Sequence, residues 1–213
     1  MLRTVLLAAH IAGGSVALLA LVPVLVATKG KGLHVRAGRA YVYGMAVALA
    51  SAYPLAVLLP SPFLGAVALF STYLVASGWR WMRRDADATA AWGVRGAVAM
   101  LVAAAGMIAV GVGQLVGGDG LGVALLVFAG IGGTLALEDL RVLRGDRPER
   151  RRRMALHLGR MLGGAIATVT AVLVVNVTTD PVWLAWVAPS IVGSPLIAWW
   201  TTKVLRPSTR AGA

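Results

Sequence analysis

The chain has 213 residues, of which 59% are apolar and only 13% are charged. Ordinary soluble domains contain about 45–50% apolar and about 25% charged residues, so the composition excludes a typical water-soluble fold and predicts a membrane protein. The formal net charge of +12 would suit a nucleic-acid partner, but the excess positive charge lies in short segments at one side of the hydrophobic runs. We therefore expect no nucleic acid among the partners of this chain.

Seven hydrophobic runs follow one another, each close to the roughly 20 residues that a membrane-spanning helix needs. They predict an all-α fold, a seven-transmembrane helical bundle that forms a single integral membrane domain over residues 1–213. The first run is too long for a cleaved secretion signal and lacks its cleavage pattern, so we expect it to be the first span. The expected spans cover about residues 4–28, 39–59, 61–79, 92–116, 121–143, 154–177 and 183–204.

The basic residues alternate between the connections. Lys and Arg residues follow the first, third, fifth and seventh runs, whereas the other three connections contain none. Because Lys and Arg near span ends are retained in the cytoplasm, the pattern predicts an N terminus outside and a cytoplasmic C terminus. The basic side should also contact the anionic lipids of the inner leaflet. Tryptophans near the run ends fit the aromatic belts of membrane proteins: Trp79, Trp81, Trp92, Trp199 and Trp200 on the inner side, and Trp183 and Trp186 on the outer side.

Ionisable side chains inside a membrane are costly, and they mark candidate functional sites. His10 lies on a face of the first run that also carries Gly13, Gly14 and Ala17, so it should point into the bundle as a relay or second site. The inner level gathers the other candidates, which are His34 in the first inner loop, Glu138 and Asp139 at the end of the fifth run, and His157 and Arg160 on one face of the sixth.

Two interpretations of the inner residues remain open. Two imidazoles and a carboxylate suit zinc or iron, which makes His34, His157 and Asp139 (or Glu138) a candidate metal site, and two imidazoles can also hold a haem. Alternatively, Asp139 and Arg160 form an ion pair and the histidines bond helix ends or neighbouring helices. His10 is separated from the inner level by about 25 Å of helix, so it should not share a metal with the others. The absence of cysteine excludes disulfides and thiolate sites.

Several short motifs resemble one family in their order and spacing. His10-Ile-Ala-Gly-Gly, Lys29-Gly-Lys31-Gly-Leu-His34, Gly38-Arg39-Ala-Tyr41-Val, Asp139-Leu-Arg141, His157-Leu-Gly-Arg160-Met161 and Ala167-Thr168-Val-Thr170-Ala171 are similar to the bacterial multi-pass membrane family called domain of unknown function 2306. The similarity extends to about Asn176 and leaves out the last span, with Trp199 and Trp200. It implies a multi-pass protein of the inner (plasma) membrane and singles out His10, His34, Asp139, His157 and Arg160, but it names no reaction.

Three functions therefore compete. The leading hypothesis is a cytoplasmic-side pocket in which His34, Asp139, His157 and Arg160 bind a metal, a haem or a small anionic ligand. The second is a small transporter or proton-coupled carrier with His10 as an outer relay. The third is a structural or assembly subunit without catalysis. No sequence motif assigns a reaction, and neither enzymatic activity nor oligomeric state follows from the sequence.

Overall fold

The computed structural model describes residues 1–83, 90–146 and 148–206. Within these ranges the chain forms seven α-helices, and each is long and apolar enough to cross a membrane. This confirms the predicted all-α fold with seven helices of spanning length. The helices are α1 (Leu2–Val26), α2 (Gly32–Leu58), α3 (Pro62–Arg80), α4 (Ala90–Val116), α5 (Leu121–Leu143), α6 (Arg150–Asn176) and α7 (Trp183–Leu205).

Two helices begin at least four residues before the predicted spans. The α2 helix starts at Gly32 rather than near residue 39, and α6 starts at Arg150 rather than near residue 154. The prediction followed apolar residues, whereas backbone hydrogen bonding continues into the polar ends, where long Arg side chains can reach water. As a result, His34 lies in the first turn of α2 and not in a loop as expected.

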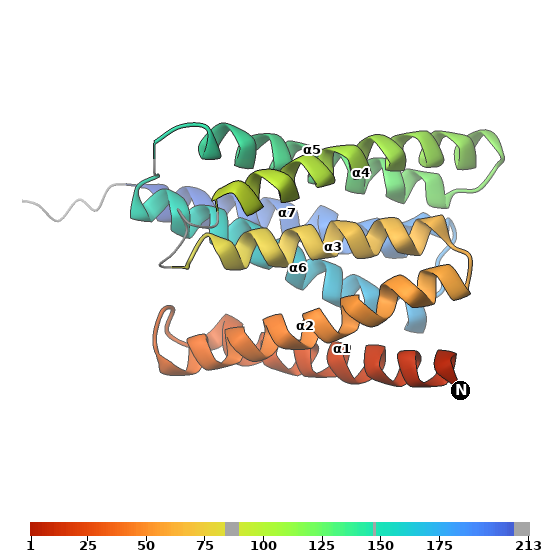
Figure 1. The fold of residues 1–213 in the computed structure, drawn as a ribbon, viewed down its shortest axis with the longest axis horizontal. Coiled ribbons are helices and arrows are strands. Elements are labelled where there is room, and N and C mark those ends of the chain that lie inside the picture. The colour runs from red at the N-terminus through yellow and green to blue at the C-terminus, as the bar shows by residue number, and fades with distance from the viewer. Residues whose placement is uncertain (84–89, 147, 207–213) are drawn as a thin grey trace, which may run out of the picture.

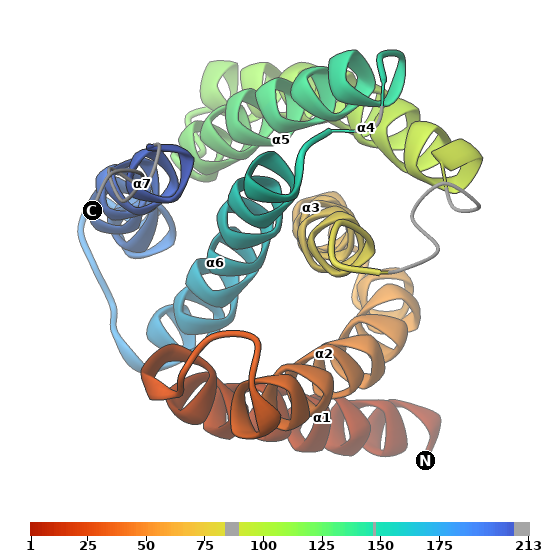
Figure 2. The same cartoon turned by 90° about the vertical axis from the view of Figure 1, so that its left-hand side faces the viewer.

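The helices form two antiparallel hairpins with a central pair between them. The α1–α2 hairpin lies on one side of the bundle and the α4–α5 hairpin on the other, with α3 and α6 running between them and α7 beside α6 (Figures 1 and 2). The connections that follow α1 and α5 and the ends of α3 and α7 lie together (Figure 1). We call this the basic end, and its described residues are 27–31, 80–83, 144–146, 148–149 and 206.

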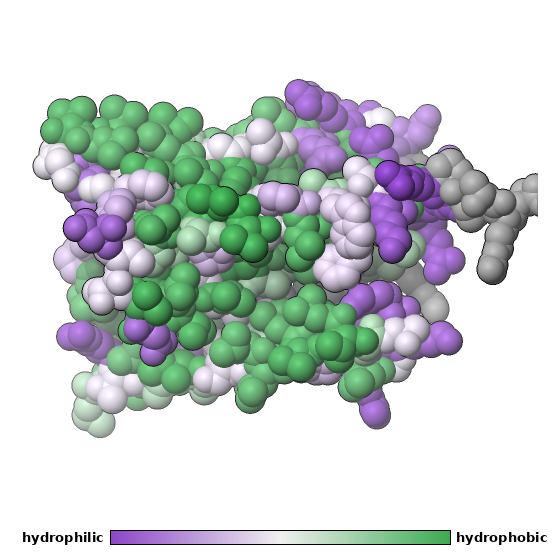
Figure 3. Space-filling view, turned by 180° about the vertical axis from the view of Figure 1, so that it is seen from behind, coloured by the Kyte–Doolittle hydropathy of each residue, from purple (hydrophilic) through white to green (hydrophobic). Residues whose placement is uncertain are grey.

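The surface separates apolar and polar residues along the same axis. Hydrophilic residues gather at the basic end, while the middle of the visible face is mostly hydrophobic (Figure 3). Many large apolar side chains remain exposed on the helices, such as Leu19 at 74%, Val102 at 69% and Val192 at 75%. Exposed apolar side chains of this kind are expected where lipid, rather than water, surrounds a bundle.

Glycine permits a close contact between α1 and α2. A Cβ atom on Gly13 of α1 would lie 2.7 Å from the carbonyl oxygen of Gly44 in α2, and one on Gly44 would lie 2.7 Å from the Gly13 oxygen. Small residues allow such backbone approach in membranes. The predicted small-residue face of α1 is therefore correct for Gly13 and Ala17, which is fully buried. It is wrong for Gly14, where a Cβ atom would meet nothing within 4 Å.

Two buried clusters position the polar residues at the basic end. The larger one fills the space between α3, α4 and α5 and includes Phe70 and Phe128, whose rings stack at 5.2 Å. The smaller one joins α1, α2, α3 and α6 around Tyr41. The α3 helix contributes to both clusters and α6 to the smaller one, so their side chains near the basic end are surrounded by other helices.

Candidate functional site

A buried ion pair joins α5 to α6 near the basic end. Arg160 Nη2 donates hydrogen bonds to Asp139 Oδ1 at 2.7 Å, to Glu138 Oε2 at 2.8 Å and to the Leu135 carbonyl oxygen at 3.1 Å. Asp139 and Arg160 are 2% and 3% exposed, whereas the Glu138 side chain is 44% exposed. The predicted Asp139–Arg160 contact is confirmed. Glu138 extends the pair toward the surface.

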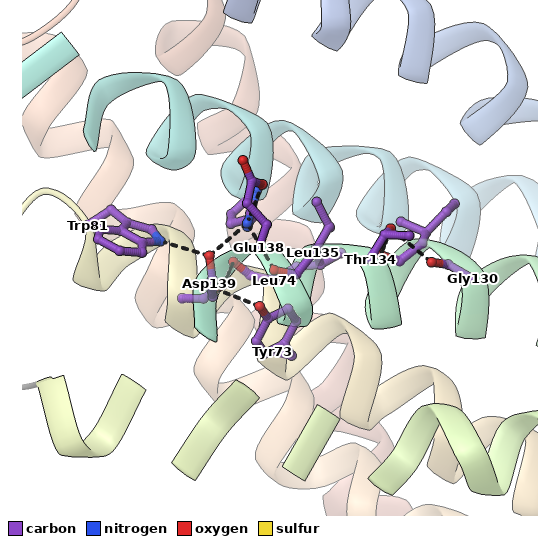
Figure 4. Close-up of polar contacts among 11 residues, drawn as sticks. Tyr73, Leu74, Trp81, Gly130, Thr134, Leu135, Glu138 and Asp139 are labelled. Carbon is purple, nitrogen blue, oxygen red and sulfur yellow. Dashed lines mark hydrogen bonds and ion pairs between the residues drawn. The ribbon is translucent and has the colours of Figure 1, made fainter. Parts of the chain in front are cut away.

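Two aromatic residues complete the shell of Asp139, and both come from the α3 side. Tyr73 donates its hydroxyl to Asp139 Oδ2 at 2.6 Å, and the indole Nε1 of Trp81 donates to Oδ1 at 3.3 Å. Figure 4 shows Tyr73 and Trp81 directed at Asp139 from different sides. With Arg160, three donors from two other helical segments surround this carboxylate.

Sequence reasoning missed this role of Tyr73 and Trp81. Trp81 was expected at the membrane interface, but it is only 2% exposed, so its indole N–H serves an internal carboxylate rather than water. The spacing of eight residues, about two helical turns, places both aromatics on one face of α3 and its end. That spacing is the feature of the sequence that could have predicted a shared hydrogen-bond partner for Tyr73 and Trp81.

A second buried guanidinium, that of Arg80, packs against the Trp81 ring. Arg80 is 2% exposed, and its Cζ atom lies 4.0 Å from the centroid of the Trp81 ring. Among the described residues, Arg80 Nε and Nη2 have no hydrogen-bond partner, and the cation–π contact partly offsets the cost of burying the charge. Gly93 of α4 makes the space, because a Cβ atom there would lie 2.7 Å from Arg80 Nε.

Each of the three histidines is bound to a backbone carbonyl through Nδ1. The Nδ1–O distances are 2.8 Å from His10 to Ala48, 3.1 Å from His34 to Val24 and 2.8 Å from His157 to Gly78. In the neutral ring, Nδ1 then carries the proton and Nε2 is left as an acceptor. His10 and His157 thereby bond neighbouring helices.

His34 has a further local role at the end of α1. Lys29 Nζ donates to the Val24 and Leu25 carbonyl oxygens at 2.8 and 2.6 Å, and His34 shares the Val24 oxygen. The last carbonyl groups of a helix lack hydrogen-bond donors within it. The side chains of Lys29 and His34 provide donors for two of these groups. Partial burial also lowers the pKa of the Lys29 ammonium group. His34 is therefore part of a helix cap.

The parallel course of α2 and α6 brings His34 and His157 to one level. The Tyr41 hydroxyl lies 3.3 Å from Thr168 Oγ1, and a Cβ atom on Gly164 would lie 2.9 Å from it. His34 and His157 precede Tyr41 and Gly164 by the same two helical turns, about 10 Å.

The predicted metal site does not assemble around this pair. His10 bonds Ala48, fourteen residues beyond His34 on α2, or about 21 Å along the helix. Asp139 is held by Tyr73, Trp81 and Arg160. Within residues 1–83, 90–146 and 148–206, no group of three or more His, Cys, Asp or Glu side chains could hold a metal ion. The His34–His157–Asp139 metal prediction and its zinc, iron and haem alternatives thus gain no support.

A cavity of about 550 Å³ begins at the Arg160 side chain and runs between α3, α5, α6 and α7. Its charged residues, Glu138, Arg152 and Arg160, all lie toward the basic end, and the rest of its wall is predominantly apolar. The sequence prediction included Arg160 and Glu138 but missed Arg152 and the whole contribution of α7. The apolar and hydroxyl-bearing lining includes Phe70, Leu74, Phe128, Ile131, Leu135, Ala167, Thr170, Trp186, Ser190, Ser194, Ala198 and Thr201.

Comparison with known proteins does not assign the chain to a family. No protein-family model, no curated protein and no solved structure matches the chain. The resemblance of its motifs to the family called domain of unknown function 2306 therefore stays a prediction.

Proposed function

We propose that this chain is an integral protein of the bacterial inner membrane, with its N terminus outside and its basic end in the cytoplasm, and that its cavity binds an amphiphilic ligand with an anionic head. The single observation that supports this function is the combination of an apolar cavity of about 550 Å³ with Arg152, Arg160 and Glu138 at one end. This volume lies within the range of about 300–1,000 Å³ that small-molecule sites occupy.

The wall chemistry matches the two parts of such a ligand. Phe70, Leu74, Phe128 and Leu135 offer contacts to a hydrocarbon chain, and burial of that chain stabilises the complex by about 25 cal/mol per Å². At the basic end, the cavity is lined by two guanidinium groups and the Glu138 carboxylate. Arg152 makes no ion pair with another described residue, and it is available to a carboxylate or phosphate.

The proposal keeps the anion binding of the leading sequence-based hypothesis but assigns it to different residues. Arg160 stays in it, and Arg152 and Glu138 replace the histidines and Asp139. Asp139 acts as a positioning residue, because its carboxylate and the Glu138 carboxylate together fix the guanidinium of Arg160 at the cavity wall.

A structural role is the second candidate, and one observation favours it. All three imidazoles bond backbone carbonyls of a neighbouring helix or a helix end, which is what a subunit that only needs helix association would require. This candidate predicts that the cavity has no ligand.

Photolabelling distinguishes the two candidates. Purified protein in phospholipid nanodiscs is incubated with a fatty acid that carries a diazirine on its chain, irradiated and digested. We expect labels on the segments of α5, α6 and α7 that line the cavity, and competition by unlabelled fatty acid. Labels spread over the outer surfaces of all helices, without competition, would contradict ligand binding.

A pair of matched variants provides the control. Ala167→Phe places a ring in the cavity and should abolish the competed label. Ala109→Phe adds the same ring on an exposed position of α4 and should leave it unchanged. Equal labelling of both variants would remove the cavity as the binding site.

A further inference from the structure

The α7 helix closes the cavity firmly only at the end opposite the basic end. There the Trp186 ring meets Phe63 of α3 edge to face, with centroids 4.6 Å apart and planes at 85°. A Cβ atom on Gly120, just before α5, would lie 3.3 Å from Trp183 Cδ1. Val187 belongs to the larger buried cluster. These contacts fix the first turns of α7 against α3 and α5.

Toward the basic end, α7 follows α6 instead. A Cβ atom on Gly159 of α6 would lie 3.9 Å from side-chain carbons of both Ile197 and Thr201, and Gly193 faces Ile166. Seen from the basic end, the near ends of α5 and α7 stand well apart with α6 between them (Figure 2). The α5 and α7 helices therefore converge at one end and diverge at the other.

The divergence leaves the cavity open on its side. Lining residues next to the gap are exposed: Glu138 on α5 is 44% exposed, Leu205 on α7 is 48% exposed, and Ser194 and Ala198 are also exposed. In a bilayer, this side opening faces the acyl chains of the leaflet at the basic end. Arg152 also exposes the charged end of the cavity at the basic end, but the predominantly apolar wall favours a hydrocarbon chain, and a lipid already lies beside the side opening.

We propose that the ligand is an anionic phospholipid of the leaflet at the basic end, and that it enters sideways between α5 and α7. This inference rests on the proposed function and names its ligand class. The phosphate stays at the level of Arg152 and Arg160, where guanidinium groups suit phosphate oxygens, and one acyl chain slides into the apolar part of the cavity. The head never crosses the hydrocarbon layer, so its charge remains at the interface throughout.

The absence of cysteine in the chain allows a direct test. Ile131 and Ser194 both line the cavity and lie eleven residues beyond the Gly120–Trp183 contact on helices that run in the same direction. A flexible bis-maleimide should bridge the double variant Ile131→Cys/Ser194→Cys across the side opening. The control pair, Gly120→Cys/Val182→Cys, is bridged where the helices already touch, since a Gly120 Cβ atom lies 3.8 Å from Val182.

The probe is phosphatidylglycerol with a diazirine on one acyl chain, mixed into phosphatidylcholine nanodiscs. Bridging the Ile131/Ser194 pair before the probe is added should lower cavity labelling by about tenfold, because access limits association, while the bridged control pair should label like the unbridged protein. Bridging after loading should retain the lipid through a wash that empties the unbridged protein. Ser194→Trp, a single substitution at the opening, should slow loading in the same direction.

The other outcomes separate this inference from the proposed function. Equal labelling before and after bridging would overturn sideways access. Labelling of the unbridged protein by the diazirine fatty acid but not by phosphatidylglycerol would overturn the phospholipid assignment and leave an amphiphile-binding cavity. Labelling by neither probe would overturn the proposed function itself.

Discussion

At the residue scale, Asp139 is the centre of the site, because it accepts hydrogen bonds from Tyr73, Trp81 and Arg160 while only 2% exposed. These three donors offset the cost of burying its carboxylate inside the bundle. Removing one member of a buried ion pair strands the other charge and costs about 3–5 kcal/mol.

A double-mutant cycle measures this dependence. Asp139→Asn and Arg160→Gln should each lower the thermal unfolding temperature in detergent, and the double variant should lose less than the sum, because no charge is left unpaired. Tyr73→Phe removes one bond to a charged group and should cost less, about 1.5–3 kcal/mol. Strict additivity of Asp139→Asn and Arg160→Gln would show that the two side chains do not interact in the membrane protein.

Charge changes at the cavity rim should alter ligand affinity without unfolding the protein. Glu138→Gln removes the one carboxylate at the anion-binding end, and it should strengthen binding of the fatty-acid probe. Arg152→Gln should weaken binding by a similar amount. For partly exposed charges the expected effect is about 0.2–1 kcal/mol, or roughly 1.5- to 5-fold in affinity. Competition titrations measure the change in affinity for each variant. The proposal requires that affinity rises for Glu138→Gln and falls for Arg152→Gln.

At the element scale, the α1–α2 pair depends on backbone approach at Gly13 and Gly44. Two adjacent glycines in α1 offer a matched comparison, because only the first faces α2.

Gly13→Ala should therefore destabilise the hairpin, since its new methyl group would meet backbone atoms of α2 at 2.7 and 2.8 Å. Overpacking of this kind costs about 1–3 kcal/mol. Gly14→Ala adds a methyl group into open space and should be neutral or slightly stabilising, because Ala favours helix over Gly. Thermal unfolding of the two variants side by side is the measurement, and equal losses would argue against the close crossing.

The elements were largely predictable, because run length and composition determine spans with little help from tertiary contacts. The Asp139–Arg160 pair was also predictable from equal depth on a short hairpin. The roles of Trp81 and His34 were not, since an interfacial tryptophan and a buried one have the same sequence neighbourhood, and helix ends continue past the apolar runs. The cavity depends on how α7 diverges from α5, which no local pattern encodes.

At the scale of the whole molecule, the main prediction is the orientation in the membrane. The spans are odd in number, and the basic residues are concentrated at one end, which we expect to face the cytoplasm. Reporter fusions after Thr28 and Asp146 should report the cytoplasm, and fusions near Pro60, Asp119 and Thr179 should report the outside, as positive-inside retention requires. Fusions after Trp81 and Arg210 should agree with the first group; residue 210 lies outside the described residues. A cytoplasmic signal at Asp119 would overturn the orientation of every helix after α4.

The hydrogen bonds around Asp139 also affect how the helices enter the membrane during synthesis. Helices emerge from the ribosome in sequence, so α3 with Tyr73 and Trp81 is in place before α5 brings Asp139, but Arg160 arrives only with α6. Until then, α5 would hold a carboxylate without its counter-charge, at a cost below the about 2.5–3.5 kcal/mol of an acidic residue at the centre of a span. We expect α5 to wait at the translocation channel and to partition into lipid together with α6, as one hairpin.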